Sequence, residues 1–265
     1  MTYITPDSKY IIITYGIGFI IILDPFSGVV VKEFKLFPEI CYEDDSLDEI
    51  DMGQYYESRT TAKFSPSGRY AVIRVRGYID PQGVTEDNAY TPVYYRSFYL
   101  MDMENLDICF HDDMEDIEES KAHSRNVAVV EFSPCEKWLI VGAIGNVIAL
   151  YDIEAKKRTD ISSSLCWISD PQEIVDCRLL TFIGENEIVS ANNDKDIEDI
   201  MIDECGKMST SRVIKTHIRD YDHKISDDIY DRWTDVKSLS YKDSIVTCEY
   251  RVSNEKYNRF FRCSI

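Results

Sequence analysis

Positive charge is scarce in this sequence, and acidic residues outnumber basic residues by a wide margin. The chain has 48 aspartates and glutamates against 29 lysines and arginines, which gives a formal net charge of −19 at pH 7. A charge of this size and sign repels nucleic-acid phosphates and anionic membranes. We therefore expect neither nucleic acid nor a membrane as a direct partner. We expect attraction to a basic protein, weakening as the salt concentration rises.

Long hydrophobic runs and targeting signals are also missing. The longest apolar run, residues 17–23, is far too short to span a bilayer. The N-terminal residues show no basic region followed by an apolar stretch, which is the pattern of a secretory signal peptide. These features predict a cytoplasmic protein whose cysteines are reduced thiols.

The motifs of common catalytic and metal sites are absent. Eight cysteines and four histidines are scattered along the chain, without the Cys-x-x-Cys pairs or the histidine spacing of a zinc site. The sequence has no phosphate-binding GxxxxGKS/T loop and no GxSxG nucleophile motif. We interpret Asp222 and His223, close to Asp227 and Asp228, as solvated loop residues. We expect no catalytic residue, no metal and no cofactor, and hence no enzyme.

What the sequence does contain is a repeated pattern of turn and strand. Three segments begin with a tight turn around a proline and continue into an apolar strand, at residues 5–13, 64–73 and 132–141. A second apolar strand follows each of them and ends in an aspartate, at Asp24, Asp102 and Asp152. The proline and the aspartate are 18 residues apart in the first and third copies and 36 apart in the second. The second copy therefore carries an insertion, which we place within residues 77–94.

Two weaker copies follow, at residues 180–207 and 236–265. Each complete copy offers four short strands in roughly 40 to 60 residues, which is the size of a propeller blade. Helical periodicity is poor, and residues 111–121 and 192–202 are the places where short helical turns are expected. The alternative fold is a β-sandwich or another all-β domain.

The turn from Phe64 to Tyr70 and the strand-terminal aspartates resemble the repeats of the WD40 family of β-propellers, over nearly the whole chain. The resemblance implies an all-β fold, a β-propeller of about five four-stranded WD40-like blades with the last blade incomplete. It implies one domain, residues 1–265, with blades at approximately 1–56, 57–122, 123–170, 171–231 and 232–265. The tryptophan of the family's Trp-Asp pair is replaced, so the family's hydrogen-bond network is not carried over. The replacing residues are Leu23, Met101, Tyr151 and Ile202.

The resemblance also implies that the links between blades and the loops between second and third strands lie on one face of the propeller, its top face. Acidic residues concentrate in these segments, and tyrosine and tryptophan, which are common interface anchors, lie beside them. The long insertion is the expected specificity loop. The candidate partner-binding residues are Asp44, Asp45, Asp48, Glu49, Tyr55, Tyr56, Tyr78, Asp80, Glu86, Asp87, Tyr90, Asp112, Asp113, Asp116, Asp194, Asp196, Asp222, Asp227, Asp228 and Trp233. The alternative interpretation is that these charges only keep solvated loops soluble.

These observations favour a non-catalytic scaffold whose acidic, aromatic top face binds a basic protein or peptide, for example as an inhibitor or immunity-type protein. Two alternatives remain open. One is a subunit of a larger assembly, in which another chain covers the incomplete terminal blades. The other is a carbohydrate-active or other hydrolytic propeller, although no pair of carboxylates stands out as its acid and base.

Overall fold

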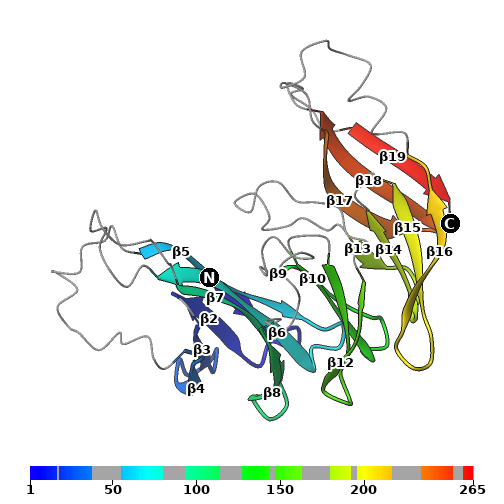
Figure 1. Ribbon diagram of the computed structural model, residues 1–265. Helices are drawn as coiled ribbons and strands as arrows, with labels where there is room; N and C mark the ends of the chain where they lie inside the picture. The colour runs from blue at the N-terminus through cyan, green and yellow to red at the C-terminus, as the bar shows by residue number, and fades with distance from the viewer. Residues whose placement is uncertain are drawn as a thin grey trace. The chain divides into compact units, whose positions relative to one another are not determined.

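Every regular element of the protein is a β-strand in the part of the chain that the structure describes (Figure 1). This computed structural model describes residues 1–16, 18–37, 55–79, 93–113, 127–143, 147–162, 180–191, 196–216, 234–252 and 259–264. Within these ranges no helix is long and apolar enough to cross a membrane. The prediction of an all-β fold is confirmed. Contacts within the chain divide it into two units, Met1–Met114 and Glu115–Ile265.

The first unit contains two antiparallel sheets, in each of which strands that are consecutive in sequence are neighbours. Sheet 1 consists of β1 (Thr2–Ile4), β2 (Ile11–Tyr15), β3 (Phe19–Leu23) and β4 (Val30–Lys35). Sheet 2 consists of β5 (Tyr55–Phe64), β6 (Tyr70–Ile79), β7 (Val93–Asp102) and β8 (Asp107–Asp112). Strands β6 and β7 have 10 residues each, whereas β2 and β3 have 5. The inserted residues of the second copy therefore lengthen both strands of this hairpin.

The second unit contains three sheets of the same meandering order. Sheet 3 consists of β9 (Val127–Phe132), β10 (Trp138–Ala143), β11 (Val147–Asp152) and β12 (Lys157–Ser162). Sheet 4 consists of β13 (Leu180–Phe182), β14 (Glu187–Ala191), β15 (Ile197–Ile202) and β16 (Met208–Ile214). Sheet 5 has three strands, β17 (Thr234–Lys242), β18 (Ile245–Val252) and β19 (Arg259–Ser264). The five predicted repeats thus correspond to five sheets, while the single domain and its five blade ranges stay predictions.

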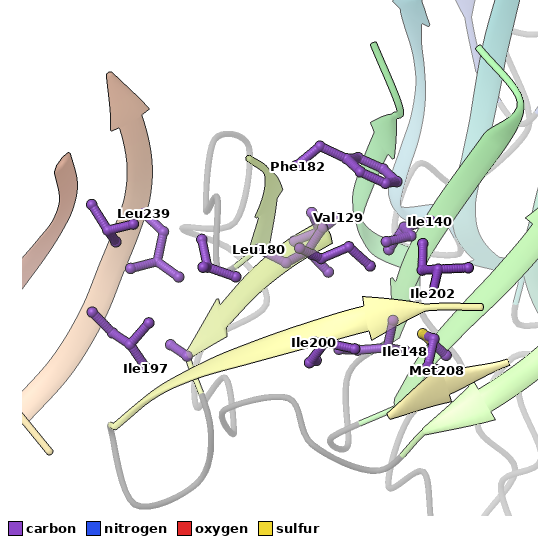
Figure 2. Packing of buried hydrophobic residues seen from close by; sticks show 14 of the residues in the cluster. Val129, Ile140, Ile148, Leu180, Phe182, Ile197, Ile200, Ile202, Met208 and Leu239 are labelled. Carbon is purple, nitrogen blue, oxygen red and sulfur yellow. The ribbon is translucent and has the colours of Figure 1, made fainter. Parts of the chain in front are cut away.

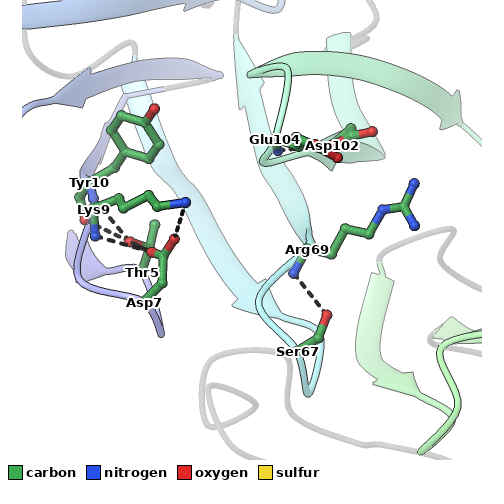
Figure 3. Close-up of polar contacts among 8 residues, drawn as sticks. All are labelled: Thr5, Asp7, Lys9, Tyr10, Ser67, Arg69, Asp102 and Glu104. Atoms are coloured by element: carbon green, nitrogen blue, oxygen red, sulfur yellow. Dashed lines mark hydrogen bonds and ion pairs between the residues drawn. The ribbon is translucent and has the colours of Figure 1, made fainter.

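The first turn of sheets 1, 2 and 3 is held by the same hydrogen bonds, which supports the alignment of the three copies. In sheet 3 the Trp138 backbone N–H donates to Ser133 Oγ at 3.0 Å, and the Ser133 N–H donates to the Trp138 carbonyl at 2.9 Å. The equivalent pairs are Tyr70 with Ser65 and Tyr10 with Thr5, the second of which is drawn in Figure 3. The hydroxyl residue before each proline is therefore a structural part of the turn.

The aspartates that end the third strands cap the turn that follows. Asp152 Oδ1 accepts a hydrogen bond from the Ala155 N–H at 2.7 Å, and Asp102 Oδ1 accepts one from the Glu104 N–H at 2.9 Å. Asp24 and Asp203 make the same kind of contact with the backbone two or more residues ahead. Aspartate is common at the start of a turn because its carboxylate accepts hydrogen bonds from backbone N–H groups that have no backbone acceptor there.

Each unit has its own hydrophobic core between neighbouring sheets. In the second unit, sheet 4 contributes both of its faces, because successive residues of a strand point to opposite sides. Figure 2 shows Ile200 and Ile202 near Ile148 and Ile140 of sheet 3, whereas Ile197 points toward Leu239 of sheet 5. In the first unit, the core consists of side chains from sheets 1 and 2, among them Ile12, Ile20, Ile22, Ile73 and Met101.

The expectation of helical turns is wrong wherever the structure tests it. Residues 111–112 belong to β8 and residues 197–202 form the whole of β15. Strand β15 pairs along its length with β14 on one edge and β16 on the other. These hydrogen bonds to distant residues, and the burial that accompanies them, override the weak local preference of the sequence.

Candidate functional site

The antiparallel order of each sheet brings half of its strand ends to one side. In sheet 3, Ala143 at the end of β10 pairs with Val127 and with Val147, the first residues of β9 and β11. The last residue of β12, Ser162, pairs with Ile148 at the same end. We call this end of each sheet the linker end, and the opposite end, which carries the tight turns described above, the turn end.

The segments that join the strands at the linker ends carry most of the charge of the protein. These segments lie outside the described residues and are 38–54, 80–92, 114–126, 144–146, 163–179, 192–195, 217–233 and 253–258. They contain 24 of the 48 acidic residues but only 8 of the 29 basic residues, a net charge of −16. The described strands and turns contain 24 acidic and 21 basic residues, a net charge of −3. The acidic excess is therefore attached to one end of every sheet.

Most of the predicted partner-binding residues belong to these segments and lie outside the described residues. They are Asp44, Asp45, Asp48, Glu49, Asp80, Glu86, Asp87, Tyr90, Asp116, Asp194, Asp222, Asp227, Asp228 and Trp233. Of the remaining six, all but Asp196 are found at the linker end of sheet 2. The prediction that they bind a partner stays a prediction.

The backbone of sheet 2 brings three of the predicted tyrosines together. Tyr55 and Tyr56 begin β5, and Tyr78 lies near the end of β6. The register places Tyr56 opposite Tyr78, which in turn lies opposite Tyr94 of β7. A row of tyrosines thus crosses the linker end of this sheet, where the long insertion joins it.

Asp112 and Asp113 lie at the linker end of β8, the other edge strand of the same sheet. Asp112 is the last residue of β8, is half-buried and pairs with Phe98. Asp113 follows it and is exposed. Both acids are therefore positioned by the sheet itself, next to the acidic segment 114–126.

Asp196 has a structural role. Its side chain is almost completely buried, and its carboxylate accepts hydrogen bonds from Lys215 Nζ at 2.5 Å and from the Thr216 N–H at 3.1 Å. A buried carboxylate with an ion pair and a backbone donor fastens the start of β15 to the end of β16. We leave Asp196 out of the proposed binding surface for this reason.

A group of charged residues that the sequence did not single out lies within sheet 4. Asp199 of β15 is only 5% exposed, and its Oδ2 accepts a hydrogen bond from Arg212 Nη2 of β16 at 3.3 Å. Burial, and then the neighbouring Asp199 charge, raise the pKa of Glu187 on β14, while Arg212 acts in the opposite direction. The signal in the sequence was two adjacent acids, Glu198 and Asp199, inside an apolar strand.

The described residues hold no group of three or more histidine, cysteine, aspartate or glutamate side chains arranged to bind a metal ion. The acidic and histidine-containing stretch around Asp222 and His223 lies outside them. What the geometry offers is therefore a set of rigid sheets with charged segments attached at one end, an arrangement in which the scaffold orients loops for contact with another molecule.

The sequence was compared with protein-family models and with curated proteins, and neither comparison gives a match.

Proposed function

We propose that the chain is a β-propeller with WD40-like blades, and that the linker ends of its sheets form an acidic surface that binds a basic protein or peptide. The observation that carries the binding proposal is the partition of charge. A net −16 is attached at the linker ends, against −3 in all of the described strands and turns.

The repeated sheets support the propeller. Four sheets have four strands in sequential order, and the first turns of sheets 1, 2 and 3 share the same hydrogen bonds. In the second unit the first strand of sheet 4, β13, contacts both β9 and β17, the first strands of sheets 3 and 5. Neighbouring first strands are what a ring of blades around a central channel requires.

The concentration of charge supports capture of a cationic partner. Charges of one sign gathered on one surface attract an oppositely charged molecule over a Debye length, about 30 Å at 0.01 M salt and about 10 Å at 0.1 M. Such steering raises association rates from a typical 10⁵–10⁶ M⁻¹s⁻¹ to as much as about 10⁸–10⁹ M⁻¹s⁻¹ at low salt. The register of sheet 2 places a row of tyrosines, a residue type common at interfaces, at the same end. An inhibitor of a cationic toxin or nuclease is one concrete form of this function.

A second candidate function, a subunit of a larger assembly, is favoured by sheet 5. Strand β19 is an edge strand among the described residues, whereas the third strands of the other four sheets pair on both edges. Phe260 on β19 is 58% exposed. Strand addition by another chain is one way in which exposed strand edges are covered.

The test is an affinity capture from native lysate, at low and high salt, with variants whose charges are reversed at opposite ends of the sheets. One variant carries Asp44→Lys, Asp45→Lys and Asp48→Lys. The matched control carries Glu104→Lys, Glu154→Lys and Glu204→Lys, three exposed residues in the turn-end loops of sheets 2, 3 and 4. Both variants change the net charge by the same amount.

We expect a basic protein that is released by high salt, lost in the linker variant and retained in the control. Loss in both variants to the same degree would show that net charge alone matters. Binding that ignores salt and both variants would contradict the proposal, and fixed-stoichiometry binding of that kind would favour the assembly subunit.

A further inference from the structure

Asp199, Arg212 and Glu187 lie on the face of sheet 4 that packs toward sheet 5. Asp199 follows Ile197 by two positions in β15, so the two side chains share a face. Figure 2 shows that Ile197 points toward Leu239 of β17. In the register of the sheet, Asp199 lies between Val189, which is fully buried, and Arg212. The Asp199 carboxylate is therefore buried where sheets 4 and 5 meet.

The negative charge at this place is not fully compensated. Arg212 bonds Asp199 through Oδ2, whereas Asp199 Oδ1 is buried and has no hydrogen-bond partner among the described residues. Glu187 lies diagonally across from Asp199 on the neighbouring strand, because Val189 pairs with Asp199 and Glu187 with Met201. Two carboxyl groups thus share one guanidinium, and one buried oxygen atom lacks a donor.

Four side chains of sheet 5 that carry titratable groups face the same interface. They are the side chains of Cys248 and Tyr250 on β18 and of Cys263 and Arg259 on β19. Arg259 pairs with Tyr250 at the linker end of β19, whereas Glu187 lies at the turn end of β14. Burial raises the pKa of the Cys263 thiol, although Arg212 acts in the opposite direction, so this thiol stays neutral around neutral pH.

We propose that Glu187 and Asp199 form a pH-sensitive contact that controls how tightly sheet 5 packs on sheet 4. In the protonated form, the Glu187 carboxylic acid donates a hydrogen bond to Asp199 Oδ1 and supplies the partner that this oxygen lacks. In the deprotonated form, two carboxylates face each other beside one arginine, and this repulsion weakens the packing of sheet 5.

The direction of the pH effect follows from the environment of Glu187. Burial, and then the charge of Asp199, raise the pKa of Glu187 above its ordinary 4.5 when the sheets are packed. Separation of the sheets exposes Asp199 to water, which weakens its effect on Glu187 and lowers the pKa of Glu187 toward its ordinary value. The packed state therefore binds the proton more tightly, so the stabilisation is complete below about pH 4.5 and is lost as the pH rises through the raised pKa.

The Cys248 thiol reports this packing directly. It is 0% exposed, lies on β18 and belongs to the core between sheets 4 and 5. A maleimide reagent labels it only when sheet 5 moves away. The experiment measures the labelling rate of Cys248 by peptide mass spectrometry at about pH 5 and about pH 8, where the proton linkage differs most. Dividing by the rate of the same thiol in the urea-unfolded chain removes the effect of thiol ionisation itself.

The corrected rate is expected to rise with pH, by up to about tenfold for each unit by which the pKa of Glu187 is raised. Glu187→Gln keeps a donor for Asp199 Oδ1 and removes the titration, so its rate is expected to be slow and independent of pH. Glu204→Gln, at an exposed position of the same sheet, is the matched control and is expected to keep the dependence of the unchanged chain.

Two results would overturn the proposal. One is a corrected rate that is equal at both pH values in the unchanged chain. The other is a pH dependence that survives in Glu187→Gln. If that variant does not fold, Asp199→Asn provides a second test, because it removes the carboxylate that repels the ionised Glu187. A pH dependence as steep in Asp199→Asn as in the unchanged chain would equally refute the inference.

Discussion

Replacing Gly206 with alanine places a methyl group where sheet 4 meets sheet 3. Gly206 lies in the turn before β16 with φ of +78°, and an added Cβ would lie 2.9 Å from Thr159 Cβ and 2.9 Å from Trp138 Cη2. The left-handed backbone costs an alanine about 1–2 kcal/mol, and forcing a methyl group into a packed contact costs about 1–3 kcal/mol more. We expect Gly206→Ala to lower the free energy of unfolding of the second unit by about 2–5 kcal/mol.

The assay is urea denaturation followed by tryptophan fluorescence, because all three tryptophans of the chain fall within residues 115–265. Lys156 provides the matched control, since it occupies the corresponding turn of sheet 3 with φ of +53°. Lys156→Gly relieves only the backbone strain and is expected to stabilise by about 1 kcal/mol. If Gly206→Ala lowers the free energy of unfolding by no more than Lys156→Gly raises it, the added methyl group meets no packed contact. That result would contradict the packing of this turn against sheet 3.

Three further perturbations test single contacts. Trp138→Phe removes the hydrogen bond from Nε1 to Asn186 Oδ1 at 2.8 Å and is expected to cost about 1–2 kcal/mol in urea denaturation, with little further loss when Asn186→Ala is added. Asp152→Ala removes the acceptor of the Ala155 N–H and is expected to cost about 1 kcal/mol, whereas the exposed neighbour Glu154→Ala is expected to be nearly neutral; equal effects would contradict the capping role. The hydrogen bond from the Ser27 backbone N–H is the main cause that lowers the pKa of Asp24 below its ordinary 3.8. The fold is therefore expected to lose stability as the pH falls below about 3.8. Circular dichroism is expected to show a smaller loss in Asp24→Asn.

The strands and turns of this fold could be predicted from the sequence because their signals are local. A hydroxyl residue before proline, such as Ser65 or Ser133, together with an aromatic residue five positions later, specifies one turn with one set of hydrogen bonds. The aspartate that ends the next apolar strand specifies another turn, as Asp152 does. A repeat of such signals predicts a repeat of sheets, which the structure contains.

The burial of individual charged residues could not be predicted in the same way. The acids between Asp194 and Asp199 form one run in the sequence, in which short helical turns were expected and Asp194 and Asp196 were candidate partner-binding residues. Strand pairing divides this run, so that Asp196 fastens the start of β15 and Asp199 lies beneath sheet 5. Which side of a strand is covered depends on a neighbouring sheet that is distant in sequence, and a single strand carries no signal of that neighbour.

The position at which a partner binds shows whether the acidic linker ends are its binding surface. Amide hydrogen exchange of the captured complex, compared with the free chain, reports which backbone segments a partner protects. We expect slower exchange at the linker ends, at the start of β5, the end of β6 and the end of β8, with the turn-end loops at residues 103–106, 153–156 and 203–207 unchanged. Protection of those turn-end loops, with no change at the linker ends, would contradict it.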